Sequence, residues 1–231
     1  MEGTLSKEPG VQKMFDAIAG RYDLMNRVMT LGQDQKWRRF VVAQAGDPAG
    51  GWVLDLATGT GDIGALMIDS HAGSWVVGAD FSLNMLKQAR KRFGDRNICW
   101  QASDANSLPF GDNTFSAVTF GYLLRNVDDV SRVLAEVYRV LKPGGRVVCL
   151  DTTPPGKNLL YPFVRCYFRF GIPIMGRLIA KDEAAYAYLT GSTMDFYTAE
   201  AMMDLFKVAG FTGVGFKKYM LSTIGVHWGQ K

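Results

Sequence analysis

Short apolar runs alternate with amphipathic segments through the middle of the chain. The apolar runs predict strands over 52–57, 74–80, 97–102, 115–121 and 145–151. The amphipathic segments between them predict helices over 62–70, 82–93 and 128–141. Such alternation is typical of crossover units that build a mostly parallel sheet with helices on both faces. The pattern therefore predicts a doubly wound α/β core.

Capping and turn residues mark where the predicted helices begin and end. Ser82 is the expected N-cap of the second helix. The run Lys142-Pro143-Gly144-Gly145 is expected to form a stop and turn after Leu141. A further helix, predicted over 198–209, begins at Thr198.

The chain ends in two apolar runs, 211–219 and 221–228, that are separated by almost nothing. This spacing predicts an antiparallel hairpin that joins the sheet. One of its strands runs against the others. The expected sheet is therefore seven-stranded and mostly parallel, with one antiparallel strand.

Two segments outside the core are expected to cover the binding edge of the sheet, because ligands of doubly wound folds bind over the carboxyl ends of the strands. Residues 5–46 are predicted to be helical, with the segment 22–30 between the helices, and 154–197 form an excursion before the last helix. At 231 residues, a single domain is expected. Its predicted parts are N-terminal helices as a cover (1–50), a ligand-binding core (51–153), a helical lid insertion at the acceptor region (154–197) and a C-terminal helix and hairpin (198–231).

Composition indicates a globular protein without an extreme charge. Hydrophobic residues make up 48% and charged residues 21% of the chain, and the net charge is +4. The basic residues gather in local clusters, which are typical of solvated helix faces. Nucleic-acid binding is therefore not expected, whereas contact with an anionic membrane surface stays open. The clusters are Lys36, Arg38 and Arg39; Lys87, Arg90, Lys91 and Arg92; and Lys217 and Lys218.

Cysteine usage and the apolar segments indicate a cytoplasmic location. Cys99, Cys149 and Cys166 are odd in number and lack metal-ligand spacing, so buried thiols in a reducing cytosol are expected. The two histidines form no metal or triad constellation, and no metal site is expected. Residues 1–9 carry no signal-peptide pattern, and prolines and arginines interrupt the apolar stretch 159–180, so no transmembrane segment is expected.

A glycine turn after the first strand indicates a nucleotide-cofactor site. Gly59-x-Gly61-x-x-Gly64 matches the dinucleotide fingerprint, with Asp80 at the end of the next strand. However, Asp62 at the helix N-terminus would repel a pyrophosphate. Together with Asp55 it favours a cationic, phosphate-free ligand, and S-adenosylmethionine is preferred over NAD. The alternative is that Asp62 only caps its helix and that loop amides hold Asp55.

From about Val11 to its end, the chain resembles the menaquinone/ubiquinone C-methyltransferase family of the class I, Rossmann-like, S-adenosylmethionine-dependent methyltransferases. The class motifs are Leu54-Asp55-Leu56-Ala57-Thr58-Gly59-Thr60-Gly61-Asp62, Ala79-Asp80, Asp104-Ala105, Leu108-Pro109-Phe110 and Leu141-Lys142-Pro143-Gly144-Gly145. The family motifs are Tyr22-Asp23-x-Met25-Asn26, Trp37-Arg38-Arg39, Leu124-Arg125-Asn126-Val127, Tyr186-x-Tyr188-Leu189 with Ser192, and His227-Trp228-Gly229.

For the methyl donor, the resemblance implies that Thr60 and the glycine turn pass under the methionine part. It also implies that Asp80 holds the ribose hydroxyls and that Asp104 with Ala105 lies beside the adenine. The chemistry agrees, because a carboxylate accepts hydrogen bonds from hydroxyls and from an exocyclic amine. The predicted donor site consists of Asp55, Thr58, Gly59, Thr60, Gly61, Asp80, Phe81, Asp104, Ala105 and Gly121.

For the acceptor, the resemblance places Tyr22, Arg125 and Asn126 around the ring of an isoprenoid hydroquinone. A ring carbon becomes nucleophilic as its neighbouring phenol, with a pKa near ~10, loses its proton. Arg125 stays protonated, so it is expected to stabilise the phenolate while a water or Asp23 takes the proton. The alternative is that Arg125 and Asn126 only cap the helix junction beside 128–129.

Departures from the family pattern leave the acceptor more open than the donor. Tyr122-Leu123 stands where the family has a phenylalanine-glycine pair, Gly121 replaces a serine, and 151–155 lack the usual run. The aromatic and arginine-rich stretch 159–170 suits a lid or homodimer surface, or a place where an isoprenoid tail or a membrane docks peripherally. The alternatives are a methyltransferase for another aromatic or polyketide-like small molecule, a noncatalytic donor-binding subunit of a quinone-synthesis complex and, remotely, an NAD-dependent enzyme.

Overall fold

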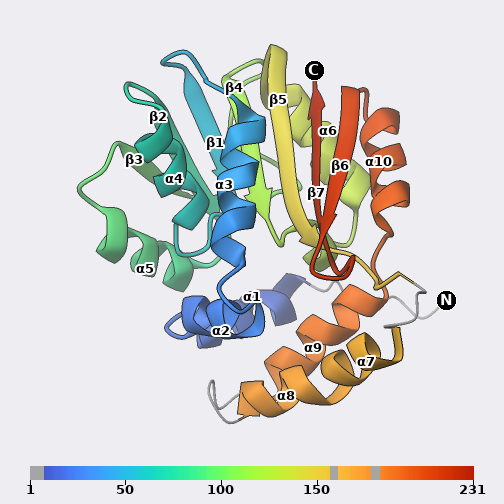
Figure 1. Ribbon diagram of the computed structural model, residues 1–231. Helices are drawn as coiled ribbons and strands as arrows, with labels where there is room; N and C mark the ends of the chain where they lie inside the picture. The colour runs from blue at the N-terminus through green and yellow to red at the C-terminus, as the bar shows by residue number, and fades with distance from the viewer. Residues whose placement is uncertain (1–7, 157–160, 178–182) are drawn as a thin grey trace, which may run out of the picture.

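The structure of the protein, a computed structural model, describes residues 8–156, 161–177 and 183–231. One seven-stranded sheet forms its centre, in the order β3-β2-β1-β4-β5-β7-β6 (Figure 1). Every strand pair from β3 to β5 is parallel, whereas β7 runs antiparallel to both of its neighbours. The predicted fold class is therefore confirmed. The strands are β1 (Trp52–Leu56), β2 (Trp75–Asp80), β3 (Ile98–Ala102), β4 (Phe115–Gly121), β5 (Leu141–Thr152), β6 (Thr212–Tyr219) and β7 (Ile224–Gln230).

Helices cover both faces of this sheet. On one face, α3 (Asp34–Ala45) and α4 (Asp62–Ser70) bury an apolar cluster that includes Trp37. On the other face, α6 (Val130–Val140) and α10 (Ala199–Val208) bury a second cluster against the strands. Helix α5 (Leu83–Phe93) packs on β2 and β3. This arrangement leaves the carboxyl ends of the parallel strands at one edge of the molecule, where doubly wound folds bind ligands.

A separate helical layer lies across that edge, at the bottom of Figure 1. Its members are α1 (Glu8–Ile18), α2 (Tyr22–Met29), α7 (Tyr161–Cys166), the π-helical stretch η2 (Tyr167–Gly171), α8 (Ile172–Met175) and α9 (Glu183–Met194). These helices share one apolar cluster, in which Phe15 and Met25 meet Phe168 and Tyr186. The predicted covers at the two ends of the core thus pack together as one layer.

Local sequence signals explain most element boundaries. The Ser82 hydroxyl accepts a hydrogen bond from the amide of Met85, and the Thr198 hydroxyl accepts one from the amide of Ala201, as the predicted N-caps require. The closing hairpin turns at 220–222, where three consecutive residues have positive φ angles.

The structure corrects four details of the prediction. Residues 22–30 were expected between helices, but α2 occupies most of them. The turn after Leu141 lies inside β5 as an irregularity in its register with β4. Helix α3 packs on the sheet face and is not part of the covering layer. Finally, Cys149 is buried as expected, but Cys99 and Cys166 are exposed, since one lies on the edge strand and the other on the outer side of α7.

Candidate active site

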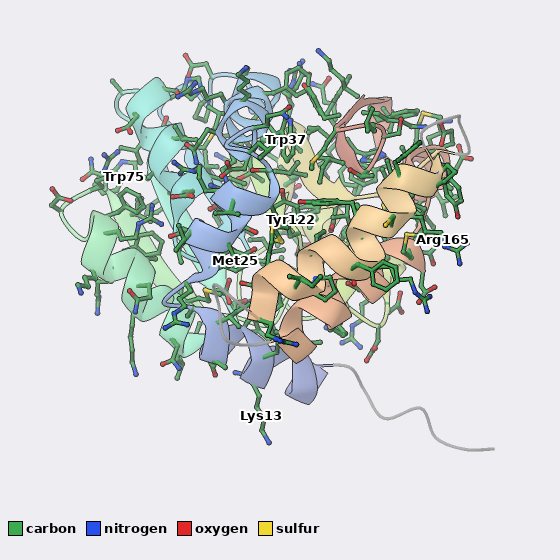
Figure 2. All side chains as sticks on the ribbon, turned by 60° about the horizontal axis from the view of Figure 1, so that its bottom comes forward. Lys13, Met25, Trp37, Trp75, Tyr122 and Arg165 are labelled. Carbon is green, nitrogen blue, oxygen red and sulfur yellow. The ribbon has the colours of Figure 1, made fainter. Side chains whose placement is uncertain are left out.

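A cavity of about 310 Å³ lies between the carboxyl ends of β1, β2 and β4 and the helices α1 and α2. In Figure 2, Tyr122 marks this place between the N-terminal helices and the α7–α9 segment. Mostly apolar side chains form the wall, and a few polar groups converge on it, as is typical of small-molecule sites. The predicted site residues among the lining are Tyr22, Gly59, Asp80, Phe81, Asp104, Ala105, Gly121 and Asn126.

The glycine turn brings the backbone to the cavity. Gly59 has a φ of +56°, and a Cβ atom there would lie 4.0 Å from the Tyr22 ring. Gly61 has a φ of +90°, and its Cβ would lie 2.7 Å from Trp100, so this glycine serves close packing and does not line the cavity. Ala57, which follows β1, has a φ of +50°, a conformation that is uncommon for a residue with a side chain. Strained backbone of this kind gathers at functional sites.

Asp80 has the geometry of a hydroxyl acceptor. Its two carboxylate oxygens each accept one backbone hydrogen bond, from Gly59 at 2.8 Å and from Ser82 at 2.8 Å. Each oxygen keeps a further lone pair, and the carboxylate lines the cavity. Burial raises the pKa of Asp80 to about 6, although backbone hydrogen bonds from Ser82, Gly59 and Phe81 act in the opposite direction. This geometry is compatible with a pair of ribose hydroxyls, and the role of Asp80 in holding them stays a prediction.

Asp104 and Ala105 lie on the far side of the same cavity. One Asp104 oxygen accepts the backbone amide of Asn106 at 2.8 Å and its side-chain amide at 2.9 Å. Ala105 is buried, and Asp104 is exposed at the rim. This pair offers a carboxylate beside an apolar wall, which suits a purine with an exocyclic amine.

A smaller compartment adjoins the main cavity at Tyr22, Gly59 and Tyr122, which line both. The predicted residues Asp55, Thr58 and Thr60 line this compartment and not the main cavity.

The two carboxylates of the sequence argument already have partners in the protein. Asp55 accepts hydrogen bonds from the hydroxyls of Thr58 at 2.6 Å and Thr119 at 2.9 Å and from the amide of Gly64 at 2.9 Å. Burial raises the pKa of Asp55 to about 6. Asp62 forms ion pairs with Arg38 and Arg92. Neither carboxylate is therefore left free for a cationic ligand. The partners also differ from those of the alternative, because two hydroxyls and one amide hold Asp55, and Asp62 pairs with arginines instead of capping its helix.

Of the predicted acceptor residues, Tyr22 and Asn126 line the cavity and Arg125 does not. The Asn126 amide nitrogen donates to the Tyr122 carbonyl at 2.7 Å, and its buried Oδ1 has no hydrogen-bond partner among the described residues. Arg125 instead donates to Asp151 at 3.2 Å, with both side chains buried. Its guanidinium stacks 4.9 Å from the Tyr122 ring.

Sequence reasoning missed several residues of the site. Tyr122, with a φ of +60°, turns the chain at the end of β4 and lines both cavities. Burial raises the pKa of its phenol, so it stays protonated. Gln12 reaches the cavity from α1 and donates to the Phe81 carbonyl at 2.9 Å. Arg38, counted among solvated charges, is buried beside Asp62. Two of these residues, Arg38 and Tyr122, lie in motifs that the sequence analysis named. A local sequence pattern, however, does not show which residues they contact.

The sheet order, the glycine turn and the acid at the end of β2 define the α/β class of S-adenosylmethionine-dependent methyltransferases. A methyltransferase from Thermotoga maritima has the same fold, with a TM-score of 0.65, 21% identity and coverage of 95% of this chain and 98% of that chain. A methyltransferase from Haloferax volcanii, solved in complex with its Trm112 activator, has a TM-score of 0.66 at 18% identity, with coverage of 94% and 96%.

The sequence profile of the ubiE/COQ5 methyltransferase family matches residues 3–231, and the chain belongs to this family. It is 72% identical to the "Ubiquinone/menaquinone biosynthesis C-methyltransferase UbiE" of Desulfotalea psychrophila, over 100% of this chain and 94% of that protein. It is 40% identical to a demethylmenaquinone methyltransferase of Lactiplantibacillus plantarum, over 96% and 95%. The protein is thus an S-adenosylmethionine-dependent methyltransferase, as the resemblance implied.

The residues present fit the donor. Asp80 would supply hydroxyl acceptors, Asp104 and Ala105 would supply an adenine edge, and Phe81 with Met85 would supply an apolar wall, since all of them line the cavity. When bound, S-adenosylmethionine supplies a methyl group on a cationic sulfur. Among the described residues, no group of three or more His, Cys, Asp or Glu side chains could hold a metal ion. Within the same ranges, every helix is too short or too polar to span a bilayer.

Proposed function

We propose that this protein methylates a ring carbon of a demethylmenaquinol-type hydroquinone during quinone biosynthesis. The observation that carries the proposal is a shared cavity: Asp80, which we assign to the donor ribose, and Asn126, whose Oδ1 has no partner among the described residues, line the same space. The names of the relatives support the quinone substrate. The reaction forms a bond between the ring carbon and the methyl carbon, breaks the methyl–sulfur bond and releases the ring proton.

The chain's own contribution is alignment and polarity. We assign Asn126 Oδ1, which has no hydrogen-bond partner among the described residues, as the acceptor for a ring hydroxyl. Tyr22, Leu123 and Val127 wall an apolar space for the ring. Holding the reacting atoms close together in such a space supplies much of the rate enhancement. Asp23 is engaged by the Thr60 hydroxyl and by Arg92, so we favour water as the proton acceptor.

Purified enzyme with S-adenosylmethionine should methylate demethylmenaquinol on carbon under reducing conditions, detected by mass spectrometry. Replacing Asn126 by Leu should lower kcat about 10²-fold, because a buried hydroxyl partner is lost, and should leave the affinity for S-adenosylhomocysteine unchanged. The oxidised quinone is the control and should not react. Turnover on another phenol with none on the quinol would favour a different aromatic acceptor. If the purified protein is unreactive and cells that carry the Asn126 variant still make the quinone at the normal rate, the result would favour a noncatalytic subunit.

We also propose that the surface formed by α7, η2 and α8 makes a peripheral contact with an anionic membrane. Val164, Phe168 and Ile172 bury one face of this segment, yet its other side exposes Phe163 (73%) and Phe170 (55%). Residues 161–177 contain three arginines and no acidic residue. Aromatic and basic side chains together suit a lipid interface. In Figure 2, Arg165 lies at the outer side of the molecule.

Replacing Phe163 and Phe170 by Ser should reduce binding to phosphatidylglycerol vesicles at least about tenfold in co-sedimentation, because two exposed aromatic side chains that would insert into the membrane are lost. Ser in place of Trp75 and Val208, which are exposed elsewhere, should leave binding unchanged. A homodimer is the competing explanation, although a two-fold contact here would set like charges against each other. The homodimer would be established by two results together: light scattering shows a dimer that the Phe replacements abolish, and the unaltered protein does not bind vesicles.

A further inference from the structure

Arg38 occupies an unusual position for a charged residue. It lies on α3, and its side chain is only 6% exposed. It lines the smaller compartment together with Tyr22 and Thr60. Among the described residues that line either cavity, Arg38 is the only Lys, Arg or His. A ligand with one carboxylate would therefore find one cationic side chain in this site.

The ion pairs of Arg38 leave part of its guanidinium available. Its hydrogen bonds to Asp34 at 3.0 Å and to Asp62 both come from Nη1. Arg92 also pairs with Asp62, at 2.7 Å, and Arg27 lies 3.6 Å from Asp34. Both carboxylates thus have a second cation. Arginine carries five N–H donors, so further donors can serve a planar anion.

The position of Asp80 gives the donor a direction. Gly59 separates the two cavities: its amide donates to Asp80 on the main side, and its backbone also lines the smaller compartment. In S-adenosylmethionine the ribose links the adenine to the amino-acid part. If the ribose binds Asp80 and the adenine lies at Asp104 and Ala105, the amino-acid part extends away from Asp104. The compartment across Gly59, where Thr60 and Arg38 lie, is the polar space on that side.

We propose that Arg38 binds the α-carboxylate of S-adenosylmethionine and so fixes the amino-acid end of the donor in the smaller compartment. Arg38 is then a donor-binding residue, and α3 contributes to the site although it packs on the sheet face. The inference rests on the donor site and not on the identity of the acceptor. It also explains why a charged side chain is buried here, since the bound carboxylate would give it a third partner.

The test compares two ligands that differ in the amino-acid end. S-adenosylhomocysteine carries the carboxylate, whereas 5′-methylthioadenosine retains the adenosine and lacks the amino-acid end. In titration calorimetry, Arg38→Gln should lower the affinity for S-adenosylhomocysteine about 30-fold, because charged hydrogen bonds are lost. The affinity for 5′-methylthioadenosine should fall less than about threefold. Arg96→Gln is the control, because Arg96 pairs with Asp69 and lines neither cavity; it should leave the affinity for both ligands unchanged.

Two further measurements guard against a variant that fails to fold. Unaltered protein should bind decarboxylated S-adenosylmethionine at least about tenfold more weakly than the intact donor, a comparison that needs no substitution. Asp34→Asn with Arg38→Gln removes one buried charge of each sign and should reproduce the ligand selectivity of the single variant. Equal binding of the intact and decarboxylated donors, or equal losses for both adenosine ligands in Arg38→Gln, would overturn the proposal. Weak donor binding in every variant alike would do so too.

Discussion

Replacing Arg125 by Met should lower the free energy of unfolding by about 3–5 kcal/mol, measured by urea denaturation at pH 7. Arg125 and Asp151 form an ion pair at 3.2 Å in which both side chains are almost fully buried. The Met variant leaves Asp151 buried without its cation, and burial already raises the pKa of that carboxyl despite Arg125 beside it. An uncompensated charge of this kind is among the most destabilising changes in a protein interior.

Two companion variants separate charge burial from other effects. Lys207→Met breaks an exposed pair with Asp204, and it should cost about 1 kcal/mol or less. Adding Asp151→Asn to Arg125→Met should recover part of the lost stability, because the buried charge disappears. If Arg125→Met were as stable as the unaltered protein yet inactive, Arg125 would act directly on the acceptor, as the sequence first indicated.

The sheet and its helices were predictable because their signals are local. Apolar alternation placed every strand to within a few residues, and the caps at Ser82 and Thr198 fixed two helix starts. The segment 142–145 shows the limit of this reasoning. Proline and glycine there indicate a turn, but pairing with β4 keeps the chain in the strand and turns the extra residues into a register shift.

The arginines show why the site was harder to predict than the fold. Arg38 stands in a basic cluster and Arg125 in a loop motif, and both patterns describe a chain neighbourhood only. Their partners, Asp62 and Asp151, lie 24 and 26 residues away along the chain. Only tertiary packing brings these charges together. Arg38 is therefore buried although its basic cluster is typical of a solvated helix face, and Arg125, expected to act on the acceptor, forms an internal ion pair.

The donor prediction was confirmed, but by a route different from its first argument. Asp55 and Asp62 were expected to attract a cationic ligand, whereas the structure satisfies both with hydroxyls, an amide and arginines. The family membership and the fold carry the conclusion instead. Asp80 is the buried carboxylate in the wall of the main cavity, whereas Asp104 is exposed, and the donor's affinity should therefore depend on Asp80.

Replacing Asp80 by Asn should lower the affinity for S-adenosylhomocysteine about 10²-fold in titration calorimetry. A carboxylate that accepts two hydroxyl hydrogen bonds contributes about 1.5 kcal/mol for each, and the neutral amide forfeits most of this. The Asn oxygen can still accept one of the amides of Gly59 and Ser82, so the fold should survive. Asp112→Asn, on the exposed surface, is the matched control and should bind normally.

The pH dependence of binding shows whether the Asp80 charge is responsible. Burial raises the pKa of Asp80 to about 6, so the carboxylate gains a proton as the pH falls through that value and loses its capacity as a double acceptor. Affinity should therefore fall about tenfold from pH 7 to pH 5. Asp55 also has a pKa of about 6, but it faces Thr58, Thr119 and Gly64. The dependence of affinity on pH should vanish in Asp80→Asn and persist in Asp55→Asn. If instead it vanished in Asp55→Asn and persisted in Asp80→Asn, Asp55 would be the group that titrates.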